Sequence, residues 1–147
     1  MITVQKSILI NRPRHEVFEF ISNFDNDAKW RTEEIELIKE HEKVLTKEMR
    51  NYSIKFFNRT LSVPTKITEY NRNKRVAFQS TDKQLLLNGY RHVVSLKSMT
   101  KLTYSLSADF KGIFKFLSAF IKRIYAGRID RDLEKLKNVL EKESKSV

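Results

Sequence analysis

Three side chains suited to acid–base chemistry lie in two neighbouring apolar stretches of the chain. Arg91 and His92 belong to the stretch from Leu85 to Lys97, and Tyr104 belongs to the next one. A histidine facing a cavity can act as a general base or polarise a ligand carbonyl, and a phenol can hydrogen-bond a buried polar group. The register of this segment is ambiguous, so His92 faces either the interior or solvent. The sequence thus offers His92, Tyr104 and Arg91 as weak catalytic candidates.

The other residues that carry chemistry do not form a recognisable site. His15 has Glu19 four residues later in a predicted helix, a spacing more typical of a surface pair than of a metal site. His41 lies in a charged segment, where we expect it to be solvated. The chain has no Cys and shows no Gly-rich phosphate loop, serine elbow or paired carboxylates. We therefore expect no metal, no cofactor and neither a hydrolase nor a nucleotide enzyme.

Aromatic residues are the second group of candidates, for binding rather than for catalysis. Ten Phe and five Tyr are a heavy load for 147 residues. Such side chains either fill a core or line a pocket for flat apolar ligands, and core packing is the alternative role for each of them. The residues that we expect to line a ligand cavity are Trp30, Phe56, Phe78, Tyr90, Tyr104, Leu106, Phe120 and Tyr125.

Apolar periodicity predicts the elements at the start of the chain. Residues 2–10 alternate as a strand, although Lys6 falls on the apolar face, which a bulge or a strand end near water would explain. Pro13 then suits the first turn of a helix, and Val17 and Ile21 give that helix its apolar face. A short second helix is expected around residues 26–29, before Trp30.

The rest of the chain predicts a sheet followed by a long helix. Short alternating stretches between polar turns, from a weak strand at residues 35–37 to residue 110, indicate an antiparallel meander. Pro64 suggests an edge or a bulge because it cannot donate to a ladder. A stretch with apolar residues at helical spacing follows, which gives the helix an apolar stripe. The repeat of these residues shifts in phase at Gly127, where a kink in the helix would cost little. The stripe consists of Ile129, Leu133, Leu136 and Leu140. The fold class is α+β, with six to seven strands curved around a long C-terminal helix, in one domain over residues 1–147.

The chain resembles the SRPBCC superfamily (START-like, polyketide cyclase/dehydrase) across nearly its whole length. The motifs that carry the resemblance are ITVQKSILINRP (residues 2–13), VFEFISNF (17–24), NDAKW (26–30), TEY (68–70), KRVAFQS (74–80), KGIF (111–114) and DLEKLK (132–137). The resemblance implies a helix-grip fold, with Trp30 near one end of a cavity. Members bind lipids, sterols, quinones, polyketides or hormones, and some act on them. It carries over no catalytic set, because the family has no universal one. Many relatives have a Gly-rich hairpin before the last strand, whereas this chain has residues 97–101, KSMTK.

The net charge of +11 points to anionic partners or simply to a basic, solvated surface. Basic and apolar residues interleave from Lys111 to Arg131, as in helices that lie on anionic membranes, whereas nucleic-acid binding would rest on charge alone. The N-terminus lacks the pattern of a signal peptide, and no apolar stretch approaches the roughly 20 residues that span a bilayer. We therefore expect a cytoplasmic protein.

A bent sheet does not close perfectly on one long helix, so this architecture predicts an apolar cavity between them. The leading hypothesis is a non-catalytic binding or carrier protein for a lipid, quinone or polyketide-like molecule. The first alternative is a polyketide cyclase or aromatase in which His92, Tyr104 or Arg91 handles protons, because catalysis by orientation needs few special residues. A second alternative is a lipid-handling protein that associates with membranes through residues 111–131.

Overall fold

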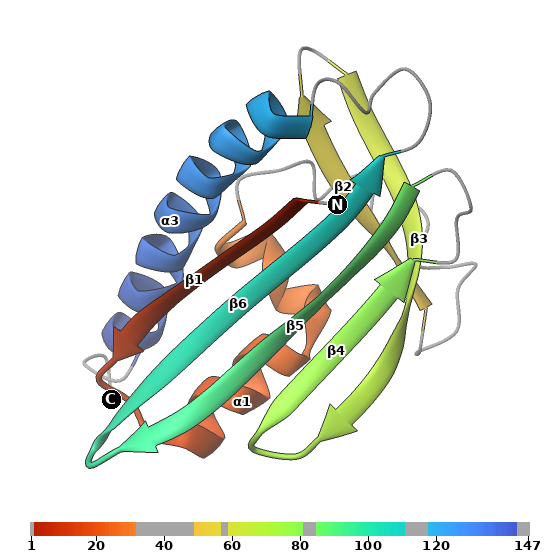
Figure 1. Ribbon diagram of the computed structural model, residues 1–147. Helices are drawn as coiled ribbons and strands as arrows, with labels where there is room; N and C mark the ends of the chain where they lie inside the picture. Colours follow the sequence, from red (N-terminus) through yellow and green to blue (C-terminus); the bar gives the residue numbers. More distant parts are fainter. Residues whose placement is uncertain (1, 32–48, 57–58, 81–84, 111–117, 144–147) are drawn as a thin grey trace.

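A computed structural model describes residues 2–31, 49–56, 59–80, 85–110 and 118–143 (Figure 1). Its elements are strand β1 (Ile2–Ile10), helix α1 (Arg14–Ser22), the 3₁₀ helix η1 (Phe24–Lys29), strands β2 (Met49–Phe56), β3 (Arg59–Asn71), β4 (Arg75–Ser80), β5 (Leu85–Leu96) and β6 (Met99–Phe110), and helix α3 (Ser118–Glu143). The predicted weak strand at residues 35–37 lies outside the described residues.

The described strands form one antiparallel sheet of six strands in the order β1-β6-β5-β4-β3-β2. Consecutive strands from β2 to β6 are neighbours, and β1 joins the far side of β6, so the meander is confirmed. Figure 1 shows α3 alongside β1 and α1 behind the sheet, where it contacts β5. The α+β helix-grip fold predicted from the sequence is therefore confirmed.

Side chains alternate between two faces of this sheet. On β6 the even-numbered residues from Leu102 to Ala108 are buried, and on β5 Leu87, Arg91 and Val93 are buried. This is the inner face, which α1 and α3 cover, and the opposite face is called the outer face. The predicted stripe of α3 is also buried. The core consequently lies between the inner face and the two helices.

Lys6 lies on the inner face, as its place in the alternating pattern of β1 indicates. Its ammonium nitrogen lies 3.3 Å from a carboxylate oxygen of Asp130, on the helix that packs against this strand. Both side chains keep contact with water, at 36% and 58% exposure. The lysine is therefore accommodated by an acidic partner on α3, and β1 pairs with β6 in unbroken register.

The C-terminal end of α3 is fastened to the turn that follows β1. The last carbonyls of a helix have no partner within the helix, and here Arg12 supplies donors to two of them. Its Nε donates to the carbonyl of Leu140 at 3.1 Å, and its Nη2 donates to that of Glu141 at 3.2 Å. The helix is continuous through Gly127. Its predicted upstream part, residues 111–117, lies outside the described residues.

The hairpin between β5 and β6 closes tightly without a glycine. Leu96 pairs with Met99, and Lys97 between them has a φ of 58°, in the left-handed region that glycine usually occupies. The departure from the Gly-rich pattern of relatives therefore leaves the hairpin intact, because a lysine adopts the conformation the turn requires.

Pro64 lies in β3, opposite Asn51 of β2. β3 is an interior strand of the sheet, between β4 and β2, so the prediction of an edge strand is wrong. A bulge lies further along the strand, where the register with β4 shifts between Ile67 and Glu69.

Gly89 is required by close packing across the sheet. A Cβ atom placed on it would lie 2.6 Å from the ring of Phe78 and 2.7 Å from the backbone oxygen of Ser105. The ring of Phe78 thus occupies the space that a side chain on its cross-strand partner would fill.

Replacing either of two glycines by alanine is expected to change stability in opposite directions. Gly89→Ala should lower the free energy of unfolding by about 1–3 kcal/mol, because the added methyl overpacks the core. Gly127→Ala should raise it by about 0.5–1 kcal/mol, because the nearest atom to the new methyl is 3.7 Å away and alanine favours the helix. Urea unfolding measures both, and a Gly89→Ala protein as stable as the parent would contradict this packing.

Candidate functional site

A buried ion pair stands at the centre of the inner face. Arg91 of β5 is 0% exposed, and its two terminal nitrogens donate to the two carboxylate oxygens of Asp27 of η1, at 2.9 and 2.7 Å. The first of these nitrogens also donates to the carbonyl of Ile21 at 2.9 Å. This fork geometry is the strongest form of arginine–carboxylate contact. It fastens α1 and η1 to the middle of the sheet.

Three aromatic rings surround the guanidinium of Arg91. Its central carbon lies 4.4 Å from the ring centre of Phe24, 5.0 Å from that of Trp30 and 5.1 Å from that of Tyr104. The rings of Trp30 and Tyr104 meet edge to face at 6.0 Å. Cation–π attraction in a dry site adds to the ion pair and holds these rings in fixed positions. Asp27, Arg91, Phe24, Trp30 and Tyr104 are called the buried cluster below.

Trp30 carries a polar group for which the described residues supply no partner. The residue is 1% exposed, yet its indole Nε1 has no hydrogen-bond partner among the described residues. A buried donor without an acceptor costs about 1–3 kcal/mol, so such atoms mark strain or a place where another molecule supplies the acceptor.

An apolar wall extends from the buried cluster along the inner face toward β3. Its residues lie in two rows, each of which runs across the sheet through positions that pair between neighbouring strands. Tyr125 of α3 is buried in the same core. The buried residues of the two rows are Val4, Phe78, Leu87, Leu106 and Ala108. On the other side of the cluster, α1 packs against β5 and β6 and fills the space with Val17, Phe18 and Ile21. The buried cluster thus lies between the half of the interior that α1 fills and the apolar wall.

The structure brings five of the predicted ligand residues to the inner side of the sheet. These are Trp30, Phe78, Tyr104, Leu106 and Tyr125, all within the buried core. The side chains of Phe56 and Phe120 lie outside the described residues. The structure also adds Asp27, which was predicted only as part of a short helix and of the NDAKW motif, without a role in a site. No local signal marks Asp27, which lies between Asn26 and Ala28 in a mostly polar segment.

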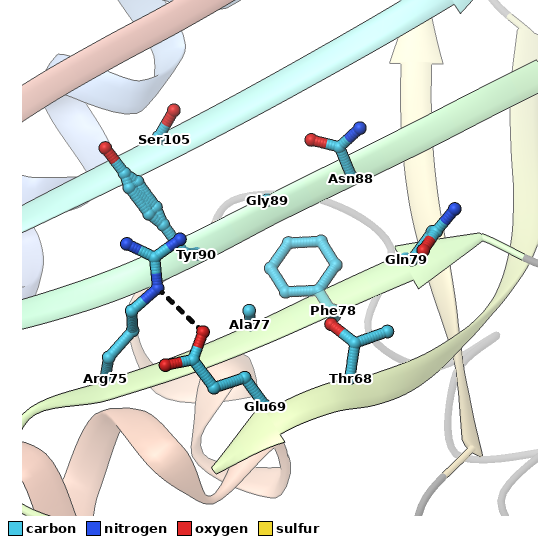
Figure 2. A pocket seen from close by; sticks show the side chains of 10 residues that line it. All are labelled: Thr68, Glu69, Arg75, Ala77, Phe78, Gln79, Asn88, Gly89, Tyr90 and Ser105. Atoms are coloured by element: carbon cyan, nitrogen blue, oxygen red, sulfur yellow. Dashed lines mark ion pairs between the residues drawn. The ribbon is translucent and has the colours of Figure 1, made fainter. Parts of the chain in front are cut away.

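Tyr90 does not line the interior, and that expectation is wrong. Residues 87, 91 and 93 of β5 point inward, so the pleat sends Tyr90 to the outer face, where its hydroxyl donates to Gln5 at 3.0 Å. There Tyr90 borders a hollow that β3, β4, β5 and β6 form together (Figure 2).

The candidate catalytic residues are divided by the sheet. His92 points to the outer face, opposite Arg75 and Thr103, whereas Arg91 and Tyr104 point inward as paired neighbours. His92 is therefore half-buried on the outer face and does not point into the interior. Arg91 is committed to Asp27, which leaves the phenol of Tyr104 as the inward candidate. The structure does not assemble an acid–base set from these three residues.

The remaining candidates stay apart from the interior. His15 and Glu19 are exposed on α1, and His41 lies outside the described residues. Among the described residues, no group of three His, Asp or Glu side chains is placed to hold a metal ion. Of the basic segment from 111 to 131, Lys122 and Arg123 are exposed on α3 and residues 111–117 are not described. No described helix is long and apolar enough to cross a bilayer.

The sequence matches a known protein family. A family model described as polyketide cyclase/dehydrase and lipid transport matches residues 1–141. No curated protein sequence matches the chain.

Solved structures share the fold at low sequence identity. TTHA0849 from Thermus thermophilus superposes with a TM-score of 0.77 at 12% identity, covering 97% of this chain and 99% of that one. A START superfamily protein from Mycobacterium smegmatis gives 0.72 at 13% identity, with 95% and 97% covered. The Zhui aromatase/cyclase from Streptomyces sp. R1128 gives 0.69 at 9% identity, with 97% and 95% covered. At such identities the likeness concerns the fold alone.

Removing the carboxylate from the buried pair is expected to cost far more than removing one from the surface. Asp27→Ala should lower the free energy of unfolding by about 3–5 kcal/mol, because it leaves the charge of Arg91 buried without its acceptor. Asp130→Ala, which breaks the partly exposed pair with Lys6, should cost less than about 1 kcal/mol.

Urea unfolding of both variants, and of Asp27→Ala combined with Arg91→Met, measures these differences. The double variant should recover part of the loss, because no unpaired charge then remains in the pair. Equal effects of Asp27→Ala and Asp130→Ala would show that the buried pair does not hold α1 and η1 on the sheet.

Proposed function

The chain belongs to the polyketide cyclase/dehydrase and lipid transport family, and from that premise we propose that it binds a small hydrophobic molecule as a carrier. The ligand lies against the inner face of the sheet, between the buried cluster and the first half of α3. Family and fold both fit hydrophobic-ligand binding or cyclase-type chemistry. The finer choice between them rests on the residues of this chain.

The apolar wall supports the location of the ligand. Its side chains are aliphatic or aromatic, and the buried part of α3 opposite contributes Tyr125 and Ile129. Small-molecule sites are generally concave and apolar, with a few polar groups that fix orientation. The other half of the interior is filled by α1, so the proposal places the ligand on the wall.

The unused indole donor of Trp30 carries the proposal on ligand chemistry. A ligand that reaches this end of the wall relieves the cost of the buried N–H group if it offers a hydrogen-bond acceptor. A hydrocarbon chain cannot do so, whereas a quinone or polyketide carbonyl can. The proposed ligand is therefore a flat apolar molecule with a carbonyl group, which the rings of Trp30 and Tyr104 contact.

The state of the candidate catalytic residues supports a carrier over an enzyme. Both terminal nitrogens of Arg91 donate to Asp27, so this guanidinium serves the fold and is not available to move a proton. His92 lies on the other side of the sheet. One inward phenol, that of Tyr104, can orient a carbonyl but gives no acid–base pair. Zhui, a structural neighbour, is an aromatase/cyclase, but its 9% identity transfers no site.

Trp30→Phe is expected to weaken carbonyl ligands selectively. The probes are menadione, a naphthoquinone, and 2-methylnaphthalene, which shares its apolar frame without the carbonyls. The variant keeps an aromatic ring but loses the donor, so the ratio of the two affinities should fall by about three- to tenfold. Equilibrium dialysis measures both affinities, and the absence of Cys excludes thiol adducts of the quinone.

Tyr70→Phe is the matched control, because this tyrosine is 61% exposed and packs on Phe18 away from the wall. It should leave both affinities unchanged. If the parent protein bound neither probe, the binding proposal would fail; if Trp30→Phe weakened both probes equally, the assigned role of the indole donor would fail.

A further inference from the structure

The outer face of the sheet carries a separate hollow of about 310 Å³ (Figure 2). It opens on the side of the sheet opposite the buried cluster, so no ligand of the inner wall reaches it. Its floor is made by Ala77, Gly89 and Ser105, three small residues on adjacent strands. Longer side chains around the floor make the rim. The hollow therefore follows from the small side chains of Ala77 and Ser105, whereas Gly89 contributes backbone to the floor and is covered by Phe78 on its inner side.

An arginine lies at the rim of the hollow, and the described residues use only part of its donor capacity. The guanidinium carbon of Arg75 lies 3.9 Å from the ring centre of Tyr90, and its Nε lies 3.1 Å from a carboxylate oxygen of Glu69 (Figure 2). The ring of Tyr90 against one face of the guanidinium and the carboxylate of Glu69 at one edge together fix the orientation of its plane. Its two terminal nitrogens make no hydrogen bond to the described residues. They remain available as donors to a molecule in the hollow.

The bulge in β3 brings an acceptor to the same rim. Regular pairing after Ile67 and Phe78 would place Thr68 opposite Ala77, but the register shift places Glu69 there instead. Bulges of this kind redirect side chains and are frequent beside binding sites. Here Thr68 and Glu69 both border the hollow. Asn88 and Gln79, which face each other across β5 and β4, add two exposed amides.

The charge of the hollow is balanced in a chain that is otherwise strongly basic. The net charge of the protein is +11, yet the charged residues that line this hollow are Glu69 and Arg75, which pair with each other. The remaining polar lining consists of amides and hydroxyls, which donate and accept equally well. Such a site offers no surplus charge to an anion or a cation, and little apolar area to a hydrocarbon.

We propose that this hollow is a second binding site, for a neutral polyhydroxylated molecule of the size of a monosaccharide unit. Each hydroxyl of such a molecule both donates and accepts a hydrogen bond. Glu69 accepts, the terminal nitrogens of Arg75 donate, and Asn88 and Gln79 do both. The site is independent of the ligand on the inner wall and of the carrier function.

Two-dimensional ¹H–¹⁵N NMR of the whole protein, titrated with the methyl glycosides of glucose, galactose and mannose, tests this site. At least one glycoside should give saturable shifts at the amides of Ala77, Gln79, Asn88 and Gly89. Asn88→Ala should weaken that binding about three- to tenfold, since one amide is lost. Lys101→Ala, an exposed change on the outer face away from the hollow, should leave it unchanged.

Glucuronate and glucosamine are the charged comparisons, and both should bind more weakly than the neutral glycoside. Tighter binding of either one would overturn the neutral class. The absence of saturable shifts with all three glycosides would overturn the site, as would shifts confined to inner-face residues such as Leu106. Because the carrier proposal is tested with menadione, failure of one proposal leaves the other standing.

Discussion

The bidentate contact between Arg91 and Asp27 is the interaction on which the rest of this structure depends. It joins the central strand of the sheet to the helical segment that follows β1, and its third hydrogen bond, to the carbonyl of Ile21, fixes the end of α1. Separating a buried charge from its partner is strongly destabilising, so the helical segment cannot move away from Arg91 without a large loss of stability. The rings of Phe24, Trp30 and Tyr104 are positioned around the same guanidinium. One electrostatic constraint thus fixes both the fold and the polar end of the proposed ligand site.

The pleat of the sheet explains why one short stretch of β5 serves two different surfaces. Arg91 points into the core, while its neighbours Tyr90 and His92 point outward. Gly89 lies between the two surfaces: Phe78 covers it on the inner side, and it forms part of the floor of the hollow on the outer side. Two basic residues on the inner face each meet an aspartate on a covering helix, Lys6 with Asp130 and Arg91 with Asp27. Opposite charges from helix and strand therefore allow a basic sequence to form an apolar interior.

The sequence predicted the fold well because its signals are local or periodic. The alternation in β1 and β6, the stripe from Ile129 to Leu140 and the turn at Asn71 to Asn73 each report on a few neighbouring residues. The site was predicted only in part, because it depends on which face a residue occupies and on contacts between distant residues. Tyr90 was assigned to the wrong face, since aromatic content does not reveal register. Asp27 was missed because its partner lies 64 positions away, and no local pattern marks such a pair.

In the proposed complex the ligand lies against the inner wall, beside Trp30. Intermolecular nuclear Overhauser effects between menadione and the ¹³C-labelled methyl groups of the protein test that position most directly. We expect contacts from the naphthoquinone ring to the methyls of Leu87, Leu106 and Ala108, with the indole N–H of Trp30 shifted on binding. Contacts confined to Leu9, Val94 and Leu96, which are exposed apolar residues of the sheet, would contradict it, as would the absence of any contact at saturating menadione.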